Sequence, residues 1–414
     1  MQCDRNGQNQ GMTASTATAT ATPLRIGVAG LGRAFTLMLP TLRHDSRVQL
    51  VAAADPSEPA RRQFSGDFGS PAYASVQELC DDPQVQVVYV ATPHQFHRAH
   101  VALAAAAGKH VLVEKPMAIT LEECQAMVQA CASAGVHMVV GHSHSFDAPI
   151  LRLRALITSG RYGRLRMVTA MNYTDFLYRP RRPEELDTRA GGGVVFSQGA
   201  HQIDILRLLC GGRLRSVRAY TGRWDAARPT EGAYSALLGF EDGSFCSATY
   251  SGYAHYDSDV LMDHIGEMGQ TKDPADYGTA RRRLHHASTG QEEAALKAAR
   301  NYGGSQSAAS DALPAGLAHQ HFGFLVASCD GADLRPTATG IEIFADQSRE
   351  VLPLPAPAIP RSEVIDELVA TVVHGQAPLH SGAWALASTE ACLAILESAR
   401  TGTDCLLQHQ IETP

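Results

Sequence analysis

Short apolar runs and longer mixed stretches alternate along the first third of the chain. The short runs predict buried β-strands, and the stretches between them have the length and composition of helices. The predicted strands span 24–30, 48–55, 85–92, 110–115 and 137–142. The predicted helices span Arg33–His44, a stretch from Glu58 onward, Phe96–Ala107, and Thr120 to about Ser133. Strands that alternate with helices predict a parallel, doubly wound α/β sheet.

The second half of the chain has a different pattern, with alternating segments and one long polar stretch. The alternation predicts strands at 163–173, 214–222, 235–240 and 244–253. Helical spacing over Val194–Leu209 places His201 and Asp204 near one another. The polar stretch 255–320 fits a lid, a helical insertion or a disordered segment. We therefore divide the chain into a disordered tail (1–22), a dinucleotide-binding domain (23–145) and a second α/β domain (146–414).

The composition is that of a globular protein and excludes several classes. With 414 residues, 44% of them hydrophobic and 19% charged, the chain can form two or three domains. A net charge of −7 gives no basis for nucleic-acid binding, and no run of about 20 apolar residues predicts a membrane span. Nine scattered cysteines without a C-x-x-C pair indicate reduced thiols in the cytoplasm. Residues 1–22 lack the regions of a signal peptide, and Met12 is a second candidate start.

The turn after the first predicted strand has the chemistry of a dinucleotide site. Its sequence is Gly30-Leu31-Gly32-Arg33-Ala34-Phe35. Glycine at position 30 permits a tight turn, and glycine at position 32 lets the backbone approach a pyrophosphate at a helix N-terminus. Phe35 departs from the fingerprint, whose third position is glycine or alanine. The candidate cofactor contacts at this turn are Gly30, Gly32, Arg33, Ala34 and Phe35.

Asp55 adds to this prediction, because a glycine turn alone also occurs in α/β domains that bind no dinucleotide. Asp55 ends the second predicted strand, where a carboxylate accepts hydrogen bonds from a ribose 2′-hydroxyl and repels a 2′-phosphate. The sequence therefore favours NAD as the cofactor. Arg61 and Arg62 on the next helix keep NADP open as the alternative.

Two further motifs lie at strand ends, where open α/β sheets bind ligands. Thr92, Pro93 and His97 form the first, and Glu114-Lys115 forms the second; all five are candidate cofactor contacts. A salt bridge at the rim of the sheet is the structural alternative for the Glu–Lys pair. In a partly dry cleft, the pKa of Lys115 would fall toward neutrality and its amine could accept a proton. Only four of the 35 basic residues are lysines, and of these Lys115 alone ends a buried strand.

Together these motifs resemble those of the Gfo/Idh/MocA family, which contains glucose–fructose oxidoreductase, inositol dehydrogenase and rhizopine-catabolism proteins. The glycine turn, Thr92-Pro93 and Glu114-Lys115-Pro116 follow the order found in that family. In the second half, Gly191-Gly192-Gly193 and the segment from Gly199 to Asp204 resemble its G-G-G…G-x-H-x-x-D element. Residues 378–382 and 391–402 resemble its closing loop and helix.

The resemblance carries expectations about fold, catalysis and assembly. It implies a Rossmann domain followed by an α/β domain built on a large, open, mostly antiparallel sheet. It implies that Lys115 and His201 are the catalytic residues at the substrate carbinol. Many relatives have an aspartate four residues before the histidine, whereas this chain has Ser197, which supplies no charge. The open sheet often mediates self-association in the family, so a homodimer or homotetramer is expected.

Within the family, residues 30–39, 191–209 and the long segment near 255–320 resemble the dihydrodiol branch, typified by phthalate 4,5-cis-dihydrodiol dehydrogenase. This likeness implies NAD-dependent oxidation of a secondary hydroxyl on a small molecule, a cis-dihydrodiol of an aromatic acid. An anionic substrate of this kind needs bidentate donors, and Arg179 or Arg182 is the expected carboxylate partner, a solvated basic loop being the alternative. The candidate substrate contacts are Lys115, Tyr173, Arg179, Arg182, Gln198, His201 and Asp204.

Two other functions stay open, a sugar or polyol dehydrogenase of the inositol type and a non-catalytic NAD-binding regulator. Ser197 speaks against the inositol type, and the presence of both Lys115 and His201 speaks against a regulator. Histidine pairs at 142/144, 285/286 and 319/321 raise the question of a metal. No paired carboxylates or cysteines accompany them at ligand spacing, so no metal site is predicted.

Overall fold

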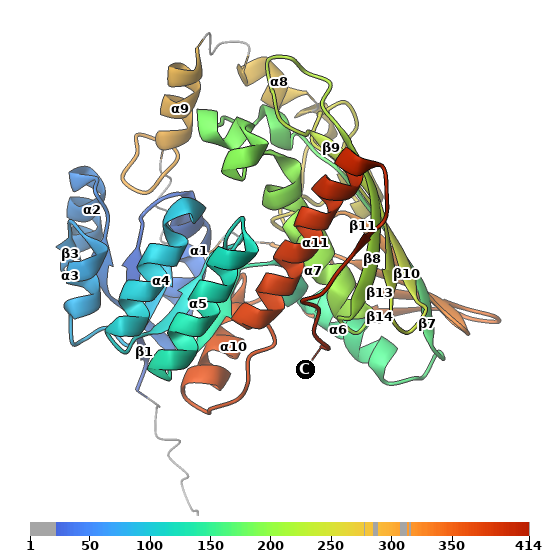
Figure 1. The fold of residues 1–414 in the computed structure, drawn as a ribbon, viewed down its shortest axis with the longest axis horizontal. Coiled ribbons are helices and arrows are strands. Elements are labelled where there is room, and N and C mark those ends of the chain that lie inside the picture. The colour runs from blue at the N-terminus through green and yellow to red at the C-terminus, as the bar shows by residue number, and fades with distance from the viewer. Residues whose placement is uncertain (1–21, 277, 285–288, 307–312, 314–315, 414) are drawn as a thin grey trace, which may run out of the picture.

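Two sheets, one parallel and one mostly antiparallel, organise the chain (Figure 1). The computed structural model describes every residue except 1–21, 277, 285–288, 307–312, 314–315 and 414. The expected disordered tail, apart from Thr22, and the His285/His286 pair lie outside the described residues.

The first sheet has six strands in the order β3-β2-β1-β4-β5-β6, and all of its strand pairs are parallel. This is the doubly wound order of a dinucleotide-binding fold, as predicted. The predicted helix Arg33–His44 is confirmed at both ends, and the predicted strands agree to within a few residues. The elements are β1 (Leu24–Ala29), α1 (Arg33–His44), β2 (Val48–Ala54), α2 (Glu58–Phe68), β3 (Ala72–Tyr73), α3 (Val76–Asp81), β4 (Val87–Val90), α4 (His97–Ala106), β5 (His110–Val113), α5 (Leu121–Ala134) and β6 (Met138–Val140).

Helix α10 (Ser362–Val372) returns to this first domain from the far end of the chain. Val364, Ile365 and Leu368 are buried in the same hydrophobic cluster as Ile26 of β1. The Thr41 hydroxyl of α1 also donates to a carbonyl just before α10. The segment that leads into α10 is therefore held close to the dinucleotide-binding turn.

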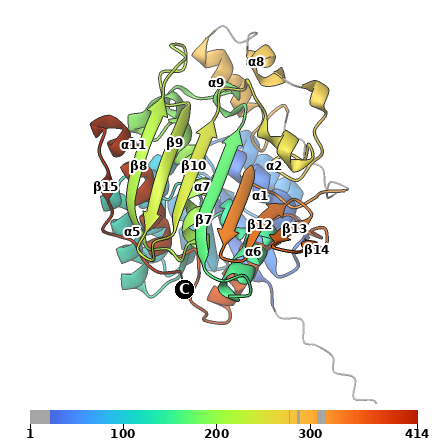
Figure 2. The ribbon, with the colours of Figure 1, turned by 90° about the vertical axis from the view of Figure 1, so that its right-hand side faces the viewer.

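The second sheet has nine strands in the order β14-β13-β12-β11-β7-β10-β9-β8-β15, and the expectation of a large, open, mostly antiparallel sheet is confirmed. β7 and β10 pair in parallel, and the other pairs are antiparallel. Helices α6, α7 and α11 lie on one face, and Figure 2 looks onto the other face, which no described helix covers. The elements are α6 (Ala148–Thr158), β7 (Leu165–Tyr173), α7 (Ala200–Leu209), β8 (Leu214–Gly222), β9 (Ala233–Phe240), β10 (Phe245–Ser251), β11 (Phe324–Cys329), β12 (Ala332–Thr337), β13 (Gly340–Ala345), β14 (Arg349–Pro353), α11 (Gly382–Thr401) and β15 (Cys405–Leu406).

The described parts of the polar stretch 255–320 include the short helices α8 (Thr279–Leu284) and α9 (Gly290–Ala298). The stretch leaves the second domain after β10 and reaches across to the first, so that α9 lies near α1 and α2 in Figure 1. There the Tyr302 ring packs edge-on against Phe35 with centroids 5.2 Å apart, and its hydroxyl donates to Asp67 at 2.5 Å. The sequence left a lid, a helical insertion or a disordered segment open for this stretch. Its described parts form a helical insertion. No helix in the described part of the chain is long and apolar enough to cross a membrane.

Candidate active site

A cleft of about 890 Å³ lies between the two domains. The first domain lines it with the glycine turn, the end of β2 and the loops after β4 and β5. The second domain contributes the loop before α7 and part of the insertion, including Lys297 of α9. The carboxyl ends of the parallel strands open into this cleft, as expected for a doubly wound sheet.

The glycine turn has the backbone geometry that a dinucleotide requires. Gly30 has a φ of +94°, and a Cβ there would lie 2.9 Å from the backbone nitrogen of Thr92. A Cβ at Gly32 would meet no protein atom within 4 Å, so its backbone borders open space in the cleft. Arg33 and Ala34 line the same cleft. These residues therefore fit a pyrophosphate at the start of α1.

Asp55 is held against this turn at the end of β2. Its carboxylate accepts hydrogen bonds from the backbone N–H of Leu31 and of Ser57, both at 2.7 Å. Arg61 donates to backbone carbonyls, one of which is that of Asp55 itself, and the exposed Arg62 pairs with Glu58. Asp55 lines the cleft and both arginines lie outside its lining, an arrangement that favours NAD.

The other predicted cofactor contacts fall into two groups. Thr92, Pro93, His97 and Glu114 line the cleft. His97 is buried and bridges two backbone carbonyls, at Thr92 and Met117, so it also fixes the loops after β4 and β5 relative to one another. Burial lowers the pKa of His97 to about 4. Phe35 is fully buried and lies outside the lining. These contacts with a cofactor stay predictions.

Lys115 follows β5 and lies in the cleft close to the second domain. Its Nζ donates a hydrogen bond to the Ser197 carbonyl at 2.9 Å. Burial lowers the pKa of Lys115 to about 8, the charge of Glu114 opposes this effect, and the charge of Arg361 adds to it. A substantial fraction of this amine is therefore neutral near physiological pH and able to accept a proton.

The other three lysines have their ammonium groups bonded to the protein. Lys109 donates to two backbone carbonyls, and Lys272 pairs with two aspartates. Lys297 also lines the cleft, but it forms an ion pair with Glu185. Of the two lysines that line the cleft, Lys115 is the one whose Nζ bonds a neutral carbonyl and not a carboxylate, so it is the better suited to proton transfer.

A π-helical turn, Val195–Gly199, leads into α7 and positions three groups at the cleft. They are the Ser197 carbonyl, the Gln198 side chain and His201. The periodicity over 194–209 predicts a regular helix, and it cannot distinguish the wider π-turn, a feature that often marks functional sites. Burial, together with the charge of Lys115, holds the pKa of His201 well below its ordinary value. The imidazole of His201 is therefore neutral.

The two histidines of the His142-Ser143-His144 segment both bond one carboxylate. Asp147 lies 2.7 Å from His144 Nδ1 and 3.3 Å from His142 Nε2. Burial opposes ionisation of Asp147, but the two histidines outweigh it and hold the pKa of its carboxyl below the ordinary value. The His144 and His201 ring centroids lie 4.8 Å apart. The Asp147–His144 pair therefore lies next to His201. It comes from the segment 142–147, whereas many relatives have an aspartate at the position of Ser197.

No group of three or more His, Cys, Asp or Glu side chains in the described residues is arranged to hold a metal ion. The sequence spacing H-x-H-x-x-D over 142–147 was the available signal for the carboxylate–histidine arrangement.

The expected carboxylate-binding arginines line the cleft but already form ion pairs. Arg179 lies 2.7 Å from Asp175 and 3.3 Å from Glu267. Arg182 lies 3.2 Å from Glu184. The assignment of either arginine to a substrate carboxylate stays a prediction.

The remaining expected substrate contacts are divided between the cleft and its surroundings. Gln198 lines the cleft. Tyr173 lies outside the lining, and its ring packs against Tyr256 with centroids 5.7 Å apart. Asp204 is a buried residue of α7, and it accepts hydrogen bonds from Trp384 and two serine hydroxyls. In this structure Asp204 joins α7 to α11 and lies outside the lining of the cleft.

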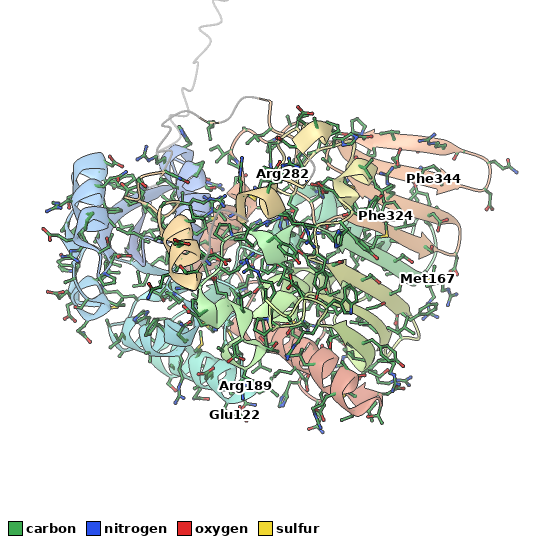
Figure 3. All side chains as sticks on the ribbon, turned by 90° about the horizontal axis from the view of Figure 1, so that it is seen from above. Glu122, Met167, Arg189, Arg282, Phe324 and Phe344 are labelled. Atoms are coloured by element: carbon green, nitrogen blue, oxygen red, sulfur yellow. The ribbon has the colours of Figure 1, made fainter. Side chains whose placement is uncertain are left out.

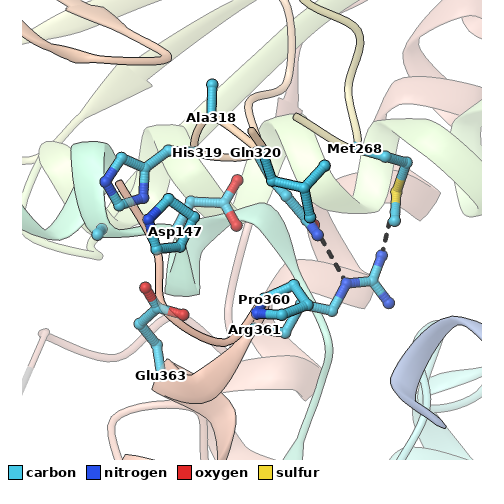
Figure 4. A pocket seen from close by; sticks show the side chains of 11 residues that line it. Asp147, Met268, Ala318, His319, Gln320, Pro360, Arg361 and Glu363 are labelled. Atoms are coloured by element: carbon cyan, nitrogen blue, oxygen red, sulfur yellow. Dashed lines mark hydrogen bonds between the residues drawn. The ribbon is translucent and has the colours of Figure 1, made fainter. Parts of the chain in front are cut away.

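Two charged residues of the cleft come from segments that carry no motif. Glu267 lies in the insertion, and Arg361 immediately precedes α10 (Figure 4). Neither has a periodic or glycine-rich context that marks it in the sequence. Their place in the site follows from the return of distant segments to the first domain.

Comparison with known proteins places this fold and site in a family. A family model described as "Oxidoreductase family, NAD-binding Rossmann fold" matches residues 24–142, and one described as "GFO/IDH/MocA C-terminal domain" matches residues 150–272. The chain belongs to the Gfo/Idh/MocA oxidoreductase family. It is an NAD-binding dehydrogenase of that family.

Individual relatives agree with this assignment. The chain is 51% identical over 379 residues to 1-carboxy-3-chloro-3,4-dihydroxycyclohexa-1,5-diene dehydrogenase of Comamonas testosteroni, covering 91% of this chain and 95% of that protein. It is 33% identical over 205 residues to trans-1,2-dihydrobenzene-1,2-diol dehydrogenase of Macaca fascicularis, covering 48% and 60%.

Solved structures show the same architecture. The crystal structure of "the putative dehydrogenase from Bordetella bronchiseptica RB50" is 40% identical with a TM-score of 0.87, covering 93% of this chain and all of that one. Aldose-aldose oxidoreductase from Caulobacter crescentus matches with a TM-score of 0.70 at 21% identity, covering the same shares, and shares the fold.

Proposed function

We propose that this protein oxidises a secondary hydroxyl of an aromatic-acid cis-dihydrodiol with NAD. The observation that carries the reaction is Lys115, a buried amine with a pKa near 8 that lies in the cleft with the neutral His201. The substrate class is supported by the relative from Comamonas testosteroni, whose name describes a carboxylated dihydroxycyclohexadiene. Phthalate 4,5-cis-dihydrodiol is the member of this class that the resemblance to the dihydrodiol branch implies.

The residues of the cleft divide the chemistry between them. NAD, when bound at the glycine turn, supplies the hydride acceptor. Lys115 Nζ accepts the proton of the substrate hydroxyl, and its hydrogen bond to the Ser197 carbonyl orients the amine. His201 holds the same oxygen by a hydrogen bond while the hydride leaves the carbinol carbon. The resulting ketone tautomerises to a catechol, and the gain of aromaticity makes the overall oxidation favourable.

A substrate panel tests this proposal directly. Phthalate 4,5-cis-dihydrodiol, a monocarboxylated cis-dihydrodiol, benzene cis-dihydrodiol, myo-inositol and glucose are each incubated with NAD or NADP, and absorbance at 340 nm is followed. We expect the highest kcat/KM with a carboxylated dihydrodiol and NAD. Faster turnover of inositol or glucose would favour the sugar or polyol alternative. Tight NAD binding without turnover of any substrate would favour the regulator.

We also propose that the open face of the second sheet mediates self-association. Exposed Tyr220, Leu237, Phe245 and Val351 lie on its strands, with exposures of 67%, 58%, 48% and 61%. Figure 3 shows Phe324 and Phe344 on this sheet, at the end of the molecule away from the first domain. A homodimer or homotetramer would cover this surface. Sedimentation of the wild type and of Leu237→Glu tests it, with a shift to a smaller species expected in the variant.

A cytoplasmic location is proposed on the basis of the thiols. All eight cysteines in the described residues are free, and the Sγ atoms of Cys210 and Cys246 lie 3.4 Å apart without a bond. A reducing compartment keeps such thiols unpaired. Cell fractionation with an antibody to the protein tests the location, and recovery from the periplasm or medium would contradict it.

A further inference from the structure

Arg361 is a buried cation in the cleft with neutral hydrogen-bond partners. Its side chain lines the cleft, and the residue is 9% exposed. Nε donates to the Gln320 side-chain oxygen at 3.1 Å, and one terminal nitrogen contacts the Met268 sulfur at 3.3 Å (Figure 4). The other terminal nitrogen has no hydrogen-bond partner among the described residues. A thioether is a weak acceptor, so these contacts compensate only part of the cost of burying the charge.

The two arginines expected from the sequence to bind a substrate carboxylate differ in this respect. Arg179 and Arg182 pair with carboxylates of the protein within 4 Å. Among the described residues, no Asp or Glu lies within that distance of Arg361. Burial lowers the pKa of Arg361, and the charge of Glu114 only partly opposes this effect. An anionic group of a ligand would complete the coordination of this guanidinium.

The position of Arg361 limits what that ligand can be. Its charge acts on both Lys115 and His201, lowering the pKa of each, so it lies within electrostatic range of the two catalytic groups. Arg361, Lys115 and His201 also line the same cleft, so one small ligand with its anionic group at Arg361 can reach Lys115. A dihydroxycyclohexadiene carboxylate has this form, with a hydroxyl and a carboxylate on one small ring.

We propose that Arg361 binds the carboxylate of the substrate and so selects carboxylated dihydrodiols over neutral ones. The inference rests on the proposed function and names the residue that determines its substrate class. The guanidinium offers donors in a planar fork that matches a carboxylate. Its hydrogen bond to Gln320 and its contact with Met268 hold that fork in place before the substrate arrives.

The test compares two ligands that differ by one carboxylate, 3,4-dihydroxybenzoate and catechol. Binding of each to the NADH-loaded protein is measured by calorimetry for the wild type, Arg361→Met and Arg361→Lys. We expect the preference for 3,4-dihydroxybenzoate to fall by roughly 10–100-fold in Arg361→Met, and catechol binding to change less than about threefold. Arg361→Lys keeps a charge and should retain part of the preference. Exposed Arg166, paired with Asp330 on the second sheet, supplies the control variant Arg166→Met.

Several results would overturn the inference. An unchanged ligand preference in a folded Arg361→Met protein would do so, as would equal loss of both ligands or a loss confined to NADH. Arg361→Gln, which also removes the charge, is judged by the same outcomes if the methionine variant unfolds. Turnover of the dihydrodiol panel by the wild type separates the two proposals: absence of turnover counts against the proposed function, and the ligand comparison judges Arg361 alone.

Discussion

Replacing Glu114 by glutamine is expected to shift the pH dependence of catalysis to lower pH. The pKa of Lys115 falls from 10.5 to about 8 because burial outweighs the attraction of Glu114. This drop corresponds to roughly 3 kcal/mol in favour of the neutral amine. At pH 7 about one amine in ten is then neutral, compared with about one in 3,000 for an ordinary lysine.

The size of the shift follows from the charge that is removed. Glu114 is buried and accepts a hydrogen bond from the Tyr89 hydroxyl at 2.5 Å, which the glutamine oxygen can still accept. A neighbouring unit charge in a partly buried site contributes roughly 1–3 kcal/mol, so its loss should lower the pKa of Lys115 by about one to two pH units. A base must be deprotonated to act, so kcat/KM rises with pH through this pKa. The midpoint should move from about pH 8 in the wild type to about pH 6–7 in Glu114→Gln.

The assay is the kcat/KM of the best dihydrodiol between pH 5.5 and 10 at saturating NAD. Glu390→Gln is the control, since Glu390 is a buried, hydrogen-bonded carboxylate near the C-terminus that is not among the main charges acting on Lys115. An unchanged or higher midpoint in Glu114→Gln, with NAD affinity retained, would refute the assignment of Lys115 as the base. So would a wild-type profile that is flat between pH 7 and 9.

Five further variants test the same geometry. Lys115→Ala should lower kcat by about 10²–10⁴-fold with an unchanged melting temperature; retained turnover would contradict its role. Gly30→Ala should lose about 1–3 kcal/mol of unfolding free energy because of its φ of +94°. Gly32→Ala should keep its stability yet bind NADH more weakly in a fluorescence titration. Asp147→Asn should lower kcat by about 10-fold or more with NADH affinity unchanged, because the histidine pair loses its carboxylate. Tyr302→Ala should cost about 3–5 kcal/mol in urea unfolding, and a loss below about 1 kcal/mol would show that the insertion does not support the first domain.

The parallel sheet could be predicted because each of its central strands is buried on both faces and forms a continuous apolar run. All four residues of β4 are buried, and α1 was predicted at both ends because polar and glycine residues flank its apolar face. β3 has two residues and α3 has six. Elements this short do not show the twofold alternation of a strand or the 3.6-residue period of a helix, so the sequence does not predict them. None of the strands β11 to β14 is among the predicted ones; in β14 most residues are exposed, so it carries no alternation between a buried and an open face.

The placement of Lys115 and His201 in one cleft could be predicted because each stands in a local motif. Their surroundings could not, because the contacts join segments far apart in the chain. The Ser197 carbonyl is a backbone group whose position depends on a π-turn, and the sequence marks only the side chain there. Arg361 reaches the cleft because α10 packs into the first domain, a tertiary contact that no local pattern encodes.

Two irregularities of the sequence prove to be one feature of the structure. Phe35 violates the dinucleotide fingerprint, and the polar stretch 255–320 interrupts the second domain. The Tyr302 ring of that stretch packs on Phe35, and a Cβ at Gly303 would lie 2.9 Å from the Ala60 backbone of α2. The large aromatic side chain at position 35 therefore provides the surface on which the insertion docks, while α9 places Lys297 in the lining of the cleft. Phe35, which departs from the dinucleotide fingerprint, is thus the residue on which a distant segment of the chain packs to reach the cleft.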